Sequence, residues 1–206
     1  MKYNVKSIWS SRYPKIIGSY EYELIPILKN LVEKNYETII NIGCAEGYYA
    51  VGFAAHNHKS NIIAVDPLAI SRDYLYALSK DNNVINQIKF YRYVTTGRLN
   101  NWIKGKTLII MDCEGAELGL LKPNKCKNLF KSDILVEVHE FVEKNLGKIL
   151  MTRLSKTHII EYIKQRNRLS ENFDLLNKID NKISQILMDE KRPANLHWLY
   201  CEAKNN

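Results

Sequence analysis

Four side chains that can accept, donate or share a proton stand where short apolar segments of the sequence end. Asp66, Asp112, Glu137 and His139 each follow or close a run rich in β-branched and apolar residues. A carboxylate can act as a base or bind a cation, and an imidazole, with a pKa of about 6.5, exchanges its proton near neutral pH. Because open α/β sheets bind ligands at the carboxyl ends of their parallel strands, we expect these groups on one rim.

A second feature with chemical meaning is a turn that contains Gly43 and Gly47, between an apolar run and a helical pattern. Glycine allows a ligand to approach the backbone closely, and the start of a helix presents N–H groups to it. Asp66 ends the next apolar run and can accept hydrogen bonds from the hydroxyl groups of a ribose. A dinucleotide fingerprint would need glycines in place of Ala45 and Tyr48, so a nicotinamide oxidoreductase is disfavoured. The G-x-x-x-G spacing indicates an S-adenosylmethionine site or, alternatively, a tight turn beside a surface carboxylate.

The elements that must position these residues follow from the hydrophobic pattern, because five short apolar runs alternate with helical patterns. The runs are Thr38–Ile42, Asn61–Val65, Ile88–Tyr93, Thr107–Met111 and Ile134–Val138. We therefore predict an α/β fold, a Rossmann-like, doubly wound sheet of about seven strands, mostly parallel, with helices on both faces. Residues 1–206 are expected to form one domain, with an N-terminal helical segment (1–36), a cofactor-binding core (37–140) and C-terminal helices and last strands (141–206).

The C-terminal quarter has a less regular pattern. An amphipathic stripe runs through Phe173–Ile186, and it either closes the core of the domain or forms the face of a homodimer. The segment Arg153–Arg166 fits a strand or a helix equally well, whereas Leu196–Ala203 alternates like a strand. His158 and His197 lie in this part and are candidates to line an acceptor pocket.

The composition is that of a globular chain with a basic balance. The 206 residues carry 30 Lys and Arg against 22 Asp and Glu, a formal net charge of +8. The basic residues are scattered and Lys outnumbers Arg, so a nucleic-acid partner is disfavoured but stays open. No run has the ~18 apolar residues of a membrane helix, and we predict a cytoplasmic protein without a membrane span. The four cysteines are dispersed without a C-x-x-C pair, which argues against a zinc site.

Four segments of the sequence carry a family resemblance. They are Asn41–Tyr49, Val65–Pro67, Met111–Glu117 and Leu135–His139. With them the chain resembles the class I S-adenosylmethionine-dependent methyltransferases, and within these the FkbM-like family. They are similar to its D-x-G-A-x-x-G-Y-Y turn, its acid-Pro pair, its D-x-E-G-x-E segment and its E-x-H strand end. The resemblance implies a methyltransferase domain that O-methylates a sugar, a polysaccharide precursor or a related small molecule.

The resemblance also implies which residues bind S-adenosylmethionine. They are Asn41, Gly43, Cys44, Ala45, Glu46, Gly47, Tyr48, Asp66, Pro67, Thr95 and Asp112. One of them departs from the family, since Asn41 stands where its members have an acid that receives the amino group of the methionine moiety. The carbonyl oxygen of Asn41 could accept that hydrogen bond without the charge, or Glu46 could supply the charge.

Methyl transfer to a hydroxyl group requires a base that removes the hydroxyl proton, or a metal ion that lowers its pKa. His139 is the first candidate for the base, oriented by Glu137 or Asp112. Alternatively, Asp112, Glu137 and His139 are the ligands of a divalent ion such as Mg²⁺. In a purely structural interpretation, Asp112 caps the helix that follows it, and Glu114 and Glu117 are expected to do the same.

Two alternative functions are compatible with the same fold. The net charge suggests an RNA methyltransferase, which would bind RNA tightly at low salt and weakly at high salt. Asn41 suggests a non-catalytic binding protein on a methyltransferase fold. A small-molecule or glycan acceptor is the leading prediction, and Trp9, Trp102 or Trp198 either stacks on its ring or packs in the core.

Overall fold

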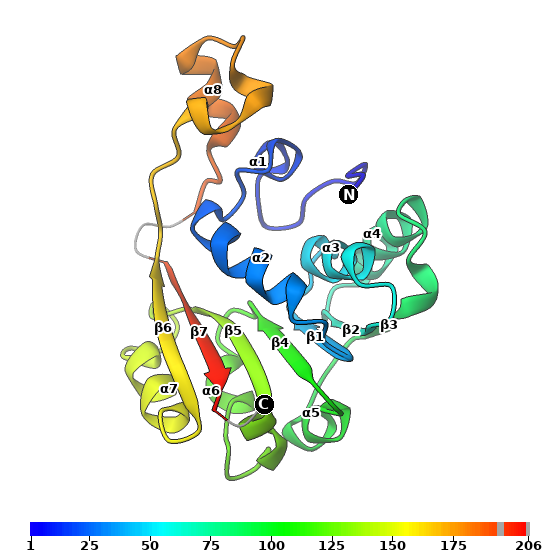
Figure 1. Cartoon of the computed structure of the whole chain (residues 1–206), viewed down its shortest axis with the longest axis vertical. Helices are drawn as coiled ribbons and strands as arrows, with labels where there is room; N and C mark the ends of the chain where they lie inside the picture. The colour runs from blue at the N-terminus through cyan, green and yellow to red at the C-terminus, as the bar shows by residue number, and fades with distance from the viewer. Residues whose placement is uncertain (193–195, 205–206) are drawn as a thin grey trace.

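Seven strands form one sheet in the order β3-β2-β1-β4-β5-β7-β6 in a computed structural model that describes residues 1–192 and 196–204 (Figure 1). They are β1 (Thr38–Ile42), β2 (Asn61–Val65), β3 (Ile88–Tyr91), β4 (Thr107–Met111), β5 (Ser132–Val138), β6 (His158–Lys164) and β7 (His197–Ala203). Strands β1 to β5 pair in parallel, whereas β7 lies antiparallel between β5 and β6. The predicted mostly parallel sheet is confirmed, and the segment that fitted either strand or helix contains β6.

The central strands are buried on both faces, which explains why their sequences are almost continuously apolar. All five residues of β1 are buried, and successive side chains point to opposite faces. Ile39 packs in the hydrophobic cluster on one face, and Ile40 and Ile42 pack in the cluster on the other. Asn41 therefore shares the face of Ile39, where it is 1% exposed.

Helices cover both faces of the sheet, as the doubly wound prediction requires (Figure 1). On one side lie α1 (Arg12–Ile17), α2 (Ile25–Glu33), α3 (Tyr48–His56) and α4 (Ala69–Asp81), and on the other α5 (Thr96–Trp102), α6 (Glu117–Leu120) and α7 (Leu146–Leu154). Leu31 of α2 and Leu75 of α4 pack in the cluster of Ile39, and Leu99 of α5 and Leu150 of α7 pack in the cluster of Ile40. Short 3₁₀ helices are η1 (Tyr22–Leu24), η2 (Ile85–Gln87), η3 (Lys127–Lys131), η4 (Ser170–Asn172) and η5 (Asp174–Leu176).

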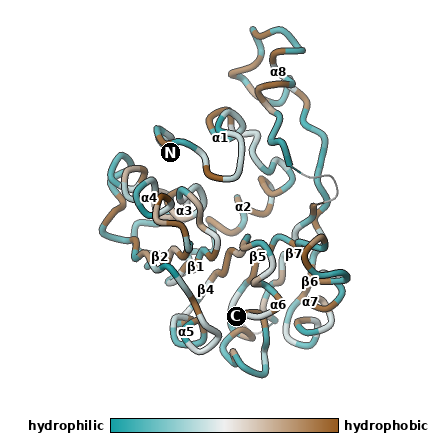
Figure 2. The backbone as a smooth tube through the Cα atoms, turned by 180° about the vertical axis from the view of Figure 1, so that it is seen from behind, coloured by the Kyte–Doolittle hydropathy of each residue, from teal (hydrophilic) through white to brown (hydrophobic). Residues whose placement is uncertain are grey.

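The segment between β6 and β7 contains α8 (Asn181–Met188) and stands away from the sheet (Figure 1 and Figure 2). Phe173, Leu176 and Met188 form a small buried cluster of their own, so part of the predicted stripe closes a local core. The other part faces outward, since Ile183 is 52% and Ile186 is 73% exposed. No helix in the described ranges is long and apolar enough to cross a membrane.

Candidate active site

A cavity of about 900 Å³ opens beyond the carboxyl ends of β1, β2, β4 and β5, at the edge of the sheet that the sequence indicated. Gly43 follows β1, Asp66 follows β2 and Asp112 follows β4, and all three line the cavity. Glu137 and His139, at the end of β5, line the same cavity. The chain leaves β1 toward β2 on one side and returns to β4 on the other, which is the crevice where open α/β sheets bind ligands.

The residues predicted to bind the cofactor divide into two groups. Gly43, Ala45, Asp66, Pro67 and Asp112 line the cavity. Among the described residues, the lining does not include Asn41, Cys44, Glu46, Gly47, Tyr48 or Thr95. Thr95 instead accepts a hydrogen bond from the N–H of Arg98 at 3.2 Å at the start of α5, and its neighbours Val94 and Thr96 face the cavity.

Both glycines of the turn are required by the protein itself. Gly43 has a φ of 76°, and a Cβ atom there would lie 1.5 Å from the carbonyl oxygen of Asp112. Gly47 has a φ of 93°, and its Cβ would lie 2.1 Å from Cδ1 of Leu75. Their positive φ angles and the contact with β4 and α4 explain the spacing, which the sequence analysis attributed to close approach of a ligand.

Asp66 organises the loop at the end of β2 while facing the cavity. One carboxylate oxygen accepts a hydrogen bond from the N–H of Ala45 at 2.9 Å. The other accepts from the N–H of Leu68 at 2.9 Å and from the hydroxyl of Ser71 at 2.7 Å. Because a carboxylate offers about four acceptor positions, capacity remains for a ligand hydroxyl group.

Glu46 and Tyr48 of the glycine turn hold the N-terminal segment over the cavity. Glu46 is fully buried, accepts hydrogen bonds from the hydroxyl of Tyr3 at 2.6 Å and the N–H of Ile8 at 3.0 Å, and pairs with Lys15. The ring of Tyr48 packs edge-on against Tyr3 and Tyr20. Through these contacts the segment brings further side chains to the cavity, namely Trp9, Lys15, Tyr20 and Glu21.

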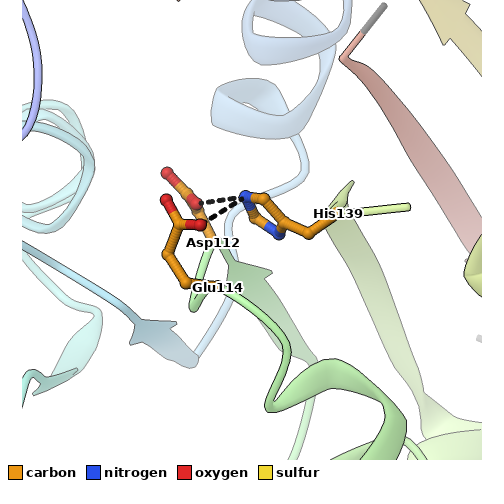
Figure 3. A group of neighbouring side chains, drawn as sticks. All are labelled: Asp112, Glu114 and His139. Atoms are coloured by element: carbon orange, nitrogen blue, oxygen red, sulfur yellow. Dashed lines mark ion pairs between the residues drawn. The ribbon is translucent and has the colours of Figure 1, made fainter. Parts of the chain in front are cut away.

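His139 lies between carboxylates that contact both ring nitrogens. Figure 3 shows two of these carboxylates, Asp112 and Glu114, which approach the same nitrogen. Its Nδ1 is 3.0 Å from Glu117, and its Nε2 is 3.4 Å from Asp112, 3.3 Å from Glu137 and 3.8 Å from Glu114. Glu117, the first residue of α6, also accepts the N–H of Cys113 at 3.2 Å in the turn before the helix, and in addition it binds the histidine. The sequence analysis missed this second role.

The surroundings of His139 fix its protonation state. Burial lowers its pKa, but hydrogen bonds and charge interactions with Asp112 and Glu117 outweigh burial and raise the pKa to about 10. For Glu117, burial raises the pKa, but the hydrogen bond and charge interaction with His139, together with backbone hydrogen bonds, outweigh burial and hold the pKa below its usual value. His139 is therefore an imidazolium at neutral pH, which favours electrostatic stabilisation over the base role predicted from the sequence.

Glu137 belongs to a buried network of charges that reaches the segment after α8. It pairs with Arg192, whose guanidinium also lies 3.4 Å from Glu21 and 3.4 Å from Glu190. Arg168 contacts Glu190 at 2.6 Å. Burial raises the pKa of Glu21 to about 8, Arg192 opposes this shift, and Asp112 and Glu190 reinforce it. No motif marks Glu21 or Arg192 in the sequence, because both stand in irregular segments that only the tertiary fold brings together.

Among the described residues, two groups of side chains each place three ligand atoms within 4.8 Å of one another, close enough to hold a cation. They are Asp112, Glu114 and His139, and Glu21, Asp112 and Glu137. Oxygen-rich sets of this kind suit hard cations such as Mg²⁺. Both sets share Asp112, and the residues predicted as metal ligands all belong to one or the other.

Four other residues proposed as acceptor contacts lie elsewhere. His158 contacts the carbonyl oxygen of Ser132 at 3.0 Å, and His197 stacks on Tyr162 with ring centroids 4.4 Å apart. Trp198 is fully buried and Trp102 packs against Tyr91. These four residues lie outside the cavity lining as the structure describes it. Trp9 is different, since it lines the cavity and is 88% exposed.

Comparisons with known proteins identify the fold. No protein-family model and no curated protein sequence matches this chain. A proposed rRNA methylase from Clostridium thermocellum superposes with a TM-score of 0.55 at 11% identity, over 87% of this chain and 94% of that one. A proposed O-methyltransferase from Klebsiella pneumoniae gives 0.55 at 10% identity, over 88% and 79%. Precorrin-6y C5,15-methyltransferase from Geobacter metallireducens gives 0.54 at 8%, over 86% and 88%. The chain thus has the fold of class I S-adenosylmethionine-dependent methyltransferases.

Proposed function

We propose that this protein is an S-adenosylmethionine-dependent methyltransferase of the FkbM-like type, which methylates a hydroxyl group of a sugar, a polysaccharide precursor or a related small molecule. The observation that carries the proposal is a shared cavity in which Asp66 and the glycine turn lie on one side and Asp112, Glu137 and His139 on the other. A volume of about 900 Å³ suits a nucleoside-sized molecule together with a small acceptor.

The cofactor half of the proposed site is formed beyond β1, β2 and β3. Asp66 binds a ribose hydroxyl with its remaining acceptor capacity. Tyr93, Val94 and Thr96 line the cavity after β3 and provide an apolar and partly polar surface for adenine. The fit is chemical as well as spatial, because the cofactor carries no phosphate and the glycine turn uses its close contacts for protein packing.

The acceptor half is formed beyond β4 and β5. Bound S-adenosylmethionine supplies an electrophilic methyl group on a sulfonium. Asp112, whose side chain is 30% exposed, accepts the proton of the acceptor hydroxyl, and the imidazolium of His139 stabilises negative charge that develops on the acceptor oxygen. Glu117 and Glu137 hold that imidazolium from its two nitrogens. Trp9, exposed at the same cavity, offers a flat surface for a sugar ring.

A divalent ion is a second way to neutralise the same carboxylates. Asp112, with Glu137 or His139, would hold it, and it would lower the pKa of the acceptor hydroxyl. The imidazolium competes with this arrangement, because a histidine must lose its proton before it binds a metal. Addition of Mg²⁺ to chelator-treated protein distinguishes the metal arrangement from the imidazolium arrangement. Turnover should rise with Mg²⁺ only if the carboxylates hold a metal ion.

The experiment that tests the proposal is calorimetric titration of the protein with S-adenosylhomocysteine, followed by a screen of sugar nucleotides and glycans as acceptors. We expect binding to wild-type protein and weaker binding to Asp66→Asn, which keeps the size and one acceptor oxygen of the side chain. Asp112→Asn should lower kcat by about 10²-fold or more. Absence of binding to folded wild-type protein would favour a non-catalytic protein on this fold.

A further inference from the structure

Glu21 is an unusual residue for a purely structural position. Its side chain is fully buried and lines the cavity. Its backbone has a φ of 47° and a ψ of 51°, a left-handed conformation that is strained for a side chain other than glycine. The N–H of Glu21 donates to Glu190 at 2.6 Å, which fixes this conformation. The fold therefore holds the Glu21 carboxylate at the cavity against both strain and loss of hydration.

The Glu21 carboxylate has no hydrogen-bond donor among the described residues. Both of its oxygens are buried without a hydrogen-bond partner. The guanidinium of Arg192 lies 3.4 Å from one oxygen, but it is shared with Glu137 and Glu190. Buried carboxylates normally have paired charges and full sets of donors. A ligand that brings a positive charge and N–H donors would complete the surroundings of Glu21 and favour its ionised form, which burial in the free protein disfavours.

The connectivity of the cofactor indicates which positive group would reach Glu21. If the adenosine part lies between Asp66 and Thr96, the sulfonium must face the acceptor near Asp112. The ammonium group is attached to the same sulfur through a short chain, so it too lies close to Asp112. Carboxylate oxygens of Glu21 and Asp112 are within 4.8 Å of one another. Asn41, by contrast, is neutral and lies outside the lining of the cavity as described.

We propose that Glu21 binds the ammonium group of the methionine part of S-adenosylmethionine, and so supplies from the N-terminal segment the charge that Asn41 cannot supply from β1. This inference rests on the proposed function. Under this inference Glu46 is not a direct ligand of the cofactor. It pairs with Lys15, anchors the N-terminal segment and so holds Glu21 in place for cofactor binding.

The test compares S-adenosylhomocysteine with its deaminated analogue, which keeps the carboxylate and lacks the ammonium group. Calorimetric titrations are made on wild type, Glu21→Gln and Glu23→Gln. Glu23 is a matched control, because it is buried in the same charge network and lies outside the cavity lining given for the described residues. Thermal unfolding shows that each variant is folded, and Glu21→Asp is a second variant that retains the charge.

We expect Glu21→Gln to weaken binding of S-adenosylhomocysteine by about tenfold or more, the difference between a charge-assisted and a neutral hydrogen bond. Binding of the deaminated analogue should not change, and Glu23→Gln should bind both ligands as wild type does. Equal losses for the two ligands, or no loss for either, overturn the inference while the proposed function stands. Absence of any binding to wild-type protein overturns the proposed cofactor and this inference together.

Discussion

The protonation of His139 depends on two carboxylates far from it in the sequence, Asp112 before α6 and Glu117 at its start, 22 residues from the histidine. The folded-state pKa of about 10 lies above the usual value. A histidine with a raised pKa stabilises the folded state fully below its unfolded pKa of about 6.5. This contribution is lost as the pH rises toward about 10.

We therefore expect wild type to exceed His139→Gln in free energy of unfolding by the largest amount below about pH 6.5. This excess should shrink as the pH rises from about 6.5 to about 10. Chemical denaturation of chelator-treated protein at several pH values measures it. His58→Gln, at an exposed histidine, is the matched control. A difference that grows with pH would contradict the imidazolium assignment.

Gly43 gives a second prediction at the scale of one residue. Because a Cβ atom would lie 1.5 Å from the Asp112 carbonyl oxygen and φ is 76°, Gly43→Ala must displace β1 or β4. We expect it to destabilise the protein by about 3 kcal/mol or more. The control is Gly52→Ala in α3, where no atom lies within 4 Å of the added Cβ, and which should stabilise by about 0.5 to 1 kcal/mol. Equal melting temperatures for Gly43→Ala and Gly52→Ala would contradict the prediction that, of these two glycines, only Gly43 must lack a Cβ atom.

The chemistry of single residues could be predicted only where a strand positions them. Asp66, Asp112 and Glu137 follow or close apolar runs, and the rule for parallel sheets brings them to one edge. Glu21 and Arg192 could not be predicted, because they lie in segments without periodicity and reach the cavity through buried ion pairs. The protonation of His139 also needed the structure, since it depends on the distance to Glu117.

At the scale of elements, the N-terminal segment is part of the site. Three groups of this segment converge on Glu46, and loss of its charge leaves Lys15 buried and unpaired. We expect Glu46→Gln to increase amide hydrogen exchange in residues 1–24 and to weaken binding of S-adenosylhomocysteine, with little effect on exchange in β4 and β5. Hydrogen exchange measured by mass spectrometry tests this. The control is Glu33→Gln, at an exposed position of α2. Unchanged exchange in residues 1–24 would contradict it.

The segment that contains α8 has an inner and an outer apolar face. Met188→Ala should destabilise this segment by about 2 to 4 kcal/mol, because it removes a side chain from the small core. Ile186→Lys, at a position 73% exposed, should change stability by less than about 0.5 kcal/mol. Local unfolding measured by hydrogen exchange separates the two variants.

The homodimer through this face stays a prediction. A lower sedimentation coefficient for Ile186→Lys than for wild type would support it.

The architecture was more predictable than the contacts between elements. Continuous apolar runs such as Thr107–Met111 predict strands buried on both faces, and all such runs became strands. The segment 153–166 could not be assigned because β6 is an edge strand with several exposed residues, and its burial does not alternate, since His158 and Ile163 are its buried residues. The anchoring of residues 1–24 by Glu46 required tertiary contacts that no periodicity encodes.

For the whole molecule, the net positive charge is not concentrated at the cavity. The chain carries +8 overall, but the carboxylates in the cavity lining are balanced by basic side chains there, namely Lys15, Arg92, Lys191 and Arg192 with His139. Because a lining without excess positive charge does not attract phosphate groups strongly, we expect RNA oligonucleotides to bind weakly at low salt and negligibly at about 0.15 M salt. Fluorescence anisotropy with a labelled oligonucleotide measures this. Tight binding at that salt concentration, in competition with S-adenosylhomocysteine, would favour the RNA methyltransferase.

The position of β7 has a consequence for synthesis of the protein. Residues 197–203 fill the place between β5 and β6, although the ribosome makes them after both of those strands. Until they emerge, β5 and β6 have no shared partner and each leaves an open edge that can pair with another nascent chain. The sheet is therefore completed only after residue 203 has left the ribosome, and chaperones that shield strand edges should matter most before that point.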